Sequence, residues 1–172
     1  EDLTLTYLRH LVISQFGHTR ERDVFDRVRS RVKRKIQAIH FLEKLDDAAA
    51  DYVALLMPEH AVWNKYTPSI RGHVRTLART LNVMPLRPVL LATLQKMPKS
   101  QVEAAFKTFV CWSVRLMIAG GLRTGATEEV CAAVACDISG GKIKSVAQLA
   151  SAMKDAIPDD ERFYEAFRAK RV

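Results

Sequence analysis

Three arginines stand four residues apart, and their guanidinium groups are the side chains best suited to bind phosphate. Arg71, Arg75 and Arg79 repeat at the spacing that places side chains on one flank of an α-helix. Residues 66–100 contain six basic residues and no acidic one, so no acid is expected beside this row. Because a planar guanidinium can bind two phosphate oxygens at once, the row predicts contact with a phosphate backbone. The alternative interpretation is a solvated basic face.

A second basic set, Arg27, Arg31 and Lys35, repeats the same spacing nearer the amino terminus. It is predicted to lie along one long helix and to form a second row parallel to the first. Such a pair of rows would follow a phosphate backbone. The second set is partly neutralised by three acidic residues: Glu21, Asp23 and Asp26.

The residues that could belong to a nuclease centre do not make up a complete one. His60 and Asn64 resemble fragments of an H-N-H centre, but no further metal ligand on a strand scaffold follows them. A loop anchored to the core by Trp63 and Tyr66 is the favoured interpretation. The carboxylates of residues 159–161 lie where a helix amino terminus favours negative charge, which accounts for them without a metal. No catalytic residue is predicted in this chain.

Metal and cofactor motifs are absent from the sequence. Cys131 and Cys136 are five residues apart, which places them on different faces of a helix. Together with Cys111 they are interpreted as buried thiols of a reducing compartment. The expected location is the cytoplasm. The histidines are scattered without the spacing of a helical zinc motif. We therefore predict no metal and no cofactor.

Arg115 lies inside an apolar segment and must find a partner if it is buried. Asp137, Glu103 or carbonyl groups at a helix end are candidates. A helical enzyme with a pocket around Trp112, Arg115 and His73 stays open as a further alternative, which the absence of a convergent pocket would dismiss.

The overall composition is that of a packed chain with a basic surface. The 172 residues include 27 Lys and Arg against 19 Asp and Glu, a net charge of +8, and 48% are hydrophobic. An excess of this kind attracts polyanions such as nucleic acid. Disorder and a disulfide scaffold are excluded. No apolar run approaches the roughly 18 residues of a membrane span, so no membrane partner is expected.

Helical periodicity recurs along the whole chain, and the expected fold is an all-α orthogonal bundle of eight or nine helices. Gly17 is expected to end the first helix and Ser145 to cap a later one. The segment with the longest apolar face, 101–119, is expected at the centre of the core. Helices are predicted over residues 3–16, about 19–45, 48–56, 68–82, 86–96, 101–119, 128–138, 146–156 and beyond Pro158.

One helical domain over residues 1–172 is the predicted organisation, because no low-complexity linker divides the chain. A division into a helical arm, 1–57, and a compact bundle, 68–172, stays open. The chain begins without Met, and we expect it to be a fragment of a longer protein.

Short motifs in their order along the chain resemble the helical region of the GmrSD-type, modification-dependent restriction endonucleases. The first group is Tyr7-Leu8-Arg9-His10, Gly17, Arg20 to Phe25, Leu45, Ala48, Ala49 and Tyr52. The second group is Leu86 to Leu91, Phe109 to Gly121 with Arg115, Ile157 to Asp160, and Phe163. The resemblance covers most of the chain.

The resemblance implies a part of a bacterial nuclease that cuts foreign, often modified, DNA in phage defence. In that family a ParB-like domain carries an Asp-Gly-Gln-Gln-Arg motif, and many members add an H-N-H nuclease; this chain contains neither motif. The resemblance therefore implies that this chain is a non-catalytic helical module that binds DNA or couples the flanking catalytic domains. The alternative is a protein-interaction scaffold whose basic helices dock on a partner domain.

Overall fold

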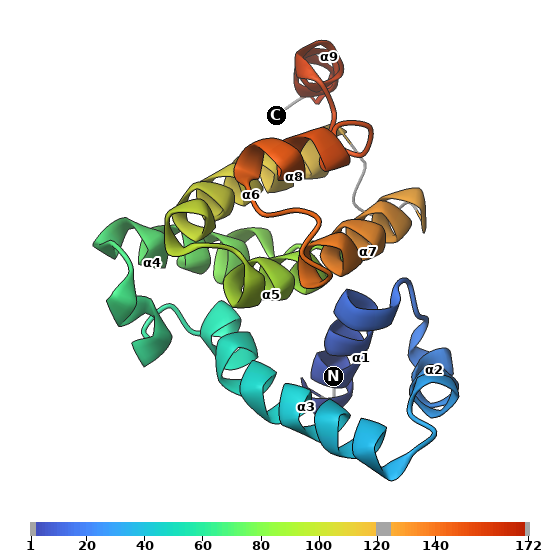
Figure 1. Ribbon diagram of the computed structural model, residues 1–172. Helices are drawn as coiled ribbons and strands as arrows, with labels where there is room; N and C mark the ends of the chain where they lie inside the picture. The colour runs from blue at the N-terminus through green and yellow to red at the C-terminus, as the bar shows by residue number, and fades with distance from the viewer. Residues whose placement is uncertain (1–2, 120–124, 171–172) are drawn as a thin grey trace.

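The computed structural model describes residues 3–119 and 125–170. These residues form nine α-helices and no strand, which confirms the predicted all-α helical bundle. Figure 1 shows α1 to α3 as one layer below α4 to α8, with α9 at the far edge. The helices are α1 Leu3–Phe16, α2 Val24–Arg31, α3 Lys35–Leu56, α4 Pro68–Arg75, α5 Arg87–Lys96, α6 Lys99–Ala119, α7 Gly125–Ser139, α8 Val146–Met153 and α9 Asp160–Ala169.

The single long helix predicted over 19–45 is wrong, because the chain breaks between α2 and α3. Arg34 is extended, with φ −119° and ψ 151°. The side chain of Gln37 accepts hydrogen bonds from the backbone N–H groups of Lys33 and Arg34, at 2.9 and 3.0 Å. It therefore satisfies donors that the start of α3 would otherwise leave unpaired. The segment predicted as a separate helix over 48–56 is the carboxyl half of α3.

Packing against α1 explains why the break is favourable. Val24 of α2 and Phe41 of α3 are buried together with Val12 of α1 in a small second core, and Val28 and Val32 pack against it. A continuous helix could not fold both segments back onto α1. The burial of apolar surface against α1 thus outweighs helix continuity.

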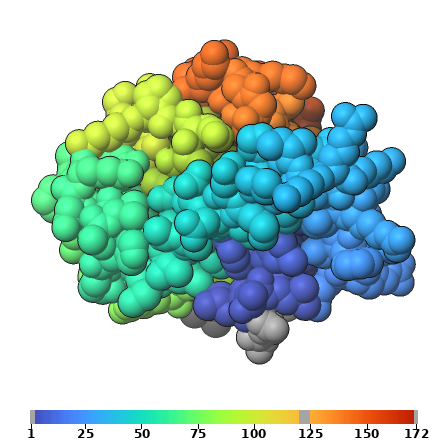
Figure 2. Space-filling model, turned by 60° about the horizontal axis from the view of Figure 1, so that its bottom comes forward, coloured from blue at the N-terminus to red at the C-terminus, as the bar shows by residue number. Residues whose placement is uncertain are grey.

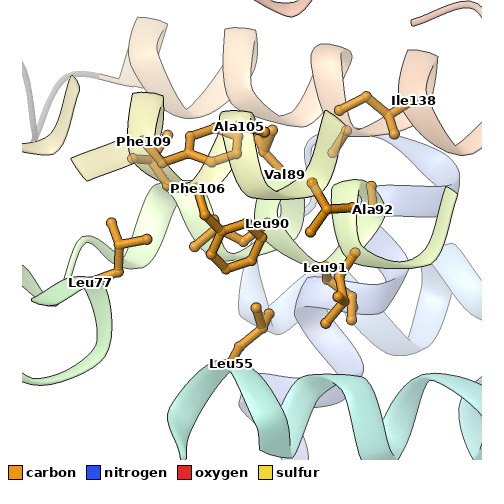
Figure 3. Close-up of a cluster of buried hydrophobic side chains, with 14 of the residues drawn as sticks. Leu55, Leu77, Val89, Leu90, Leu91, Ala92, Ala105, Phe106, Phe109 and Ile138 are labelled. Carbon is orange, nitrogen blue, oxygen red and sulfur yellow. The ribbon is translucent and has the colours of Figure 1, made fainter. Parts of the chain in front are cut away.

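The main core is centred on α5, whereas the sequence predicted α6 at its centre. Every residue of α5 from Pro88 to Leu94 is buried. A helix that is apolar all round is enclosed by its neighbours. Figure 3 shows Val89, Leu90 and Leu91 of this helix among side chains of the surrounding elements, including Phe106 of α6 and Ile138 of α7.

Residues from both parts of the chain share this core. Leu11 of α1 and Tyr52 and Leu55 of α3 belong to the same buried cluster as Leu91 and Ile138. The cluster therefore joins the segment before Pro58 to the helices that follow Pro68.

Local signals set several helix ends as predicted. Gly17 follows α1 with a φ of +90°, a left-handed conformation that favours glycine. Ser145 caps α8 by accepting a hydrogen bond from the backbone N–H of Gln148 at 3.3 Å. Asp159 caps α9 in the same way, from Arg162 at 2.9 Å. The first cap confirms the expected start of α8, whereas Pro158, which we expect in the first turn of the last helix, lies just before the cap of α9.

Candidate nucleic-acid interface

The segment that carries Arg71, Arg75 and Arg79 is fixed to the core by its opposite face. Ile70, Val74 and Leu77 are at most 7% exposed and belong to the main core. Their burial turns the arginine flank outward, where the side chains of Arg75 and Arg79 are 57% and 58% exposed. Figure 2 shows the surface of α4 beside α3 at one end of the visible face. The predicted row of arginines is therefore present on one surface.

The helix changes type within this row. Residues Thr76–Leu81 form a π-helical turn, in which the backbone N–H of Asn82 donates to the carbonyl of Leu77 at 2.9 Å. Asn82 ends the turn with a φ of +45°, a left-handed conformation that asparagine tolerates better than most residues. Arg79 lies within this turn, so its direction relative to Arg75 differs from that in a regular α-helix.

The expectation that no acid lies near the row is wrong. Glu59 reaches the row from the preceding loop: its Oε1 lies 3.4 Å from Nη2 of Arg75, and its Oε2 lies 3.2 Å from Nη2 of Arg79. The pKa of Glu59 is lowered, first by a hydrogen bond to its own backbone and then by the charges of Arg79 and Arg75. One carboxylate thus bridges two guanidinium groups.

The same loop supplies a neutral partner for Arg71. Its guanidinium donates to Oδ1 of Asn64. His60, the other residue considered for a nuclease centre, accepts a hydrogen bond from the backbone N–H of Val62 at its Nδ1, at 3.3 Å. His60 therefore has a partner within the loop, and Asn64 has one on α4.

Trp63 anchors this loop to the core, as predicted. It is fully buried and donates from Nε1 to the carbonyl of Ala54 at 2.9 Å. Its ring lies 5.4 Å from the ring of Phe106 and 5.7 Å from that of Tyr66. This anchor determines where Glu59 and Asn64 meet the arginine row.

The second basic set does not form one row, because the chain breaks between Arg31 and Lys35. Arg27 lies on α2 and donates to the carbonyl of His18 at 3.2 Å. Arg31 is the last residue of α2, and Lys35 is the first of α3. The two sets also lie at opposite ends of α3, which spans about 33 Å at 1.5 Å per residue, rather than along parallel helices (Figure 1).

Arg115 is held by partners that the sequence did not single out. Its Nη1 donates to the carbonyl of Pro158 at 3.0 Å, its Nη2 pairs with the carboxylate of Asp160, and its guanidinium lies 5.4 Å from the ring centre of Phe163. The predicted carboxylates are engaged elsewhere: Asp137 with Lys142, and Glu103 with the backbone of Thr67.

The pocket around Trp112, Arg115 and His73 that the sequence leaves open as an alternative is not assembled. A hollow between α6 and α8 is lined by Trp112 and Arg115, together with Met153 and Asp159. His73 lies on α4 and is not part of its lining. The three predicted residues therefore do not converge.

Sequence reasoning missed a polar site around His10. His10 is 3% exposed, and its Nδ1 lies 2.8 Å from the hydroxyl of Tyr52. Burial, followed by the charges of Arg87 and Arg9, lowers the pKa of His10 to about 3, so the ring is neutral near pH 7. Tyr52 and Arg87 come from parts of the chain distant from His10, which is why residue spacing gave no signal.

His10 lines a small pocket of about 60 Å³, enough for a few water molecules. At this pocket Nε2 of His18 lies 3.6 Å from Oε2 of Glu128. The pocket is too small to hold a substrate of ordinary size.

Among the residues described, the cysteines and the potential metal ligands do not form a further candidate site. Cys131 is buried as expected, whereas Cys136 is half-buried and Cys111 is exposed at the surface of α6. Burial and the charge of Glu128 raise the pKa of Cys131 to about 12, which disfavours the reactive thiolate. Over residues 3–119 and 125–170, no group of three or more His, Cys, Asp or Glu side chains is placed to hold a metal ion. None of the helices described has both the length and the apolar character needed to span a bilayer.

No protein-family model, curated protein or solved structure matches this chain significantly. Membership of the GmrSD-type family therefore stays a prediction.

Proposed function

We propose that this chain is a non-catalytic helical module that binds the DNA backbone through Arg71, Arg75 and Arg79. The observation that carries the proposal is the row of three guanidinium groups opposite a buried apolar flank, in which Arg75 and Arg79 are exposed and Arg71 is half-buried. Guanidinium groups on an exposed face bind phosphate oxygens without reading base sequence.

The charge balance of the row supports an anionic ligand. Three arginines meet one carboxylate, that of Glu59, so this surface keeps a net charge of +2. Along α4, Arg71 and Arg75 are separated by about 6 Å of helix rise, so they can meet different oxygens of one strand. Binding of this kind releases counterions and is sensitive to salt.

The resemblance to GmrSD-type nucleases indicates the kind of protein in which we propose that this module acts. In a cytoplasmic restriction or phage-defence nuclease of the GmrSD type, the module would lie between flanking catalytic domains and hold DNA for them. Arg27, Arg31 and Lys35 would add contacts from the other end of α3. No catalytic residue, metal or cofactor is assigned to this chain.

Fluorescence anisotropy with a labelled duplex at low salt tests the proposal. The triple variant Arg71→Ala, Arg75→Ala, Arg79→Ala should bind at least about tenfold more weakly than the wild type, since each neutralised phosphate contributes to affinity. A matched control removes the same charge at exposed residues elsewhere: Lys154→Ala, Arg162→Ala, Arg168→Ala. An equal drop in affinity in both triple variants would refute a specific role for the row.

A protein-interaction scaffold is the second candidate, and the junction of α2 and α3 favours it. Phe25, Ile36 and Leu42 are 72%, 55% and 63% exposed there, next to Arg31 and other basic residues. Large exposed apolar side chains beside basic ones suit a partner domain with an acidic, partly apolar surface.

Amide hydrogen exchange distinguishes this second candidate. The exchange of α2 and the start of α3 would be compared between this chain alone and the longer nuclease of which we propose that it forms a part. Protection confined to the longer protein supports docking at the junction, and identical exchange contradicts it.

A further inference from the structure

The contact of Glu59 with Arg75 and Arg79 has the form of an anion held between two cations. Each oxygen of the carboxylate faces a different guanidinium: Oε1 faces Arg75 at 3.4 Å and Oε2 faces Arg79 at 3.2 Å. Two oxygens of one phosphate group can make the same pair of contacts, because they too are bound to a single central atom and carry the negative charge.

We propose that Arg75 and Arg79 form a two-pronged site for a single phosphate group of DNA, and that Glu59 occupies this site in the free protein as an internal mimic of phosphate. This inference rests on the proposed function. It adds that the carboxylate of Glu59 competes with a DNA phosphate for Arg75 and Arg79. Binding then exchanges one anion for another at the same two guanidinium groups.

The surroundings allow Glu59 to leave without disturbing the core. Its side chain is 56% exposed, whereas its neighbour Pro58 is buried and Trp63 further along the loop is fully buried. The loop is thus fixed at these residues while the carboxylate stands in solvent. Rotation of the Glu59 side chain releases Arg75 and Arg79 while Pro58 and Trp63 stay in place.

Arg71 serves as an internal comparison within the same row. Its guanidinium is held by the neutral amide of Asn64 rather than by a carboxylate. A phosphate that binds Arg71 displaces no negative charge. Competition by the protein itself is therefore confined to the Arg75 and Arg79 pair.

Glu59→Gln is the direct test, because glutamine keeps the size and an acceptor oxygen of the side chain but removes its charge. We expect the variant to bind a labelled DNA duplex about three- to tenfold more tightly than the wild type, the range that follows from removing two exposed ion pairs. The control Glu165→Gln makes the same charge change at an exposed position of α9, and should raise the affinity by less than about twofold.

A double-mutant cycle separates competition from general charge. In an Arg75→Ala, Arg79→Ala background, Glu59→Gln should give no more gain in affinity than Glu165→Gln, because the cations that the carboxylate blocks are gone. A gain that persists in that background overturns the inference. Thermal unfolding is measured in each background with and without Glu59→Gln. Equal midpoint temperatures would show that the substitution leaves folding unchanged.

These experiments also distinguish a failure of the internal phosphate mimic from a failure of the proposed DNA binding. If the wild type binds through the arginine row but Glu59→Gln gains no more affinity than Glu165→Gln, the internal mimic is refuted and DNA binding stands. If neither the wild type nor Glu59→Gln binds the duplex at low salt, the proposed function is refuted, and the mimic with it.

Discussion

Acidification should destabilise this protein through His10. The imidazole is buried with its Nδ1 against the hydroxyl of Tyr52, and its pKa of about 3 lies well below the ordinary value. Arg87 and Arg9 disfavour the charged ring further. The folded state therefore holds His10 neutral at a pH at which the unfolded chain takes up a proton.

The sign and size of the effect follow from the pKa of His10 in the folded and unfolded states. A lowered histidine pKa contributes stability that is complete above about pH 6.5 and is lost as the pH falls toward about 3. With a folded pKa of about 3, relative to about pH 8, the free energy of unfolding should fall by about 1 kcal/mol at about pH 5.5 and by about 3 kcal/mol at about pH 4.5.

Urea unfolding of the wild type and of His10→Asn across this pH range measures the effect. Asparagine does not titrate, and its amide can face the hydroxyl of Tyr52, so the difference between the two pH profiles isolates the histidine. Parallel profiles for wild type and His10→Asn would refute the buried neutral imidazole.

Three substitutions test other parts of the structure. Trp63→Phe should lower the free energy of unfolding by about 2 kcal/mol in urea titrations, because it removes the hydrogen bond to Ala54 and leaves a gap. Arg115→Met should speed amide exchange across α9 but leave the core protected, since α9 has no buried residue of its own, and Arg162→Met should not. Asn82→Ala should cost about 1–2 kcal/mol in thermal unfolding and Asn82→Gly less, because only the alanine is strained at a φ of +45°.

Features governed by neighbouring residues could be predicted from the sequence. The bounds of α1 were predicted from its apolar pattern and from Gly17, and the start of α8 from Ser145, since caps and stops act within one turn. The break after Arg31 was missed because it depends on Val24 and Phe41 packing together with Val12 of α1, which no local pattern reveals.

In the candidate interface, too, features set by neighbouring residues could be predicted, and contacts between distant parts of the chain could not. The alternation of Ile70, Val74 and Leu77 with the arginines is local, so the row was predicted together with its buried flank. The approach of Glu59 depends on how the loop folds over α4 and bridges 16 to 20 positions of sequence. His10 and Tyr52 are 42 positions apart, and only the packing of α1 against α3 brings them together.

The salt dependence of DNA binding tests the central claim most directly. The logarithm of the binding constant of the wild type should fall linearly with the logarithm of salt concentration. The Arg71, Arg75 and Arg79 triple alanine variant should have a slope smaller in magnitude by about 2 to 3, at roughly 0.9 for each phosphate that is no longer neutralised. Binding by the wild type that is independent of salt, or a slope that the triple variant leaves unchanged, would contradict the assignment of this row to the DNA backbone.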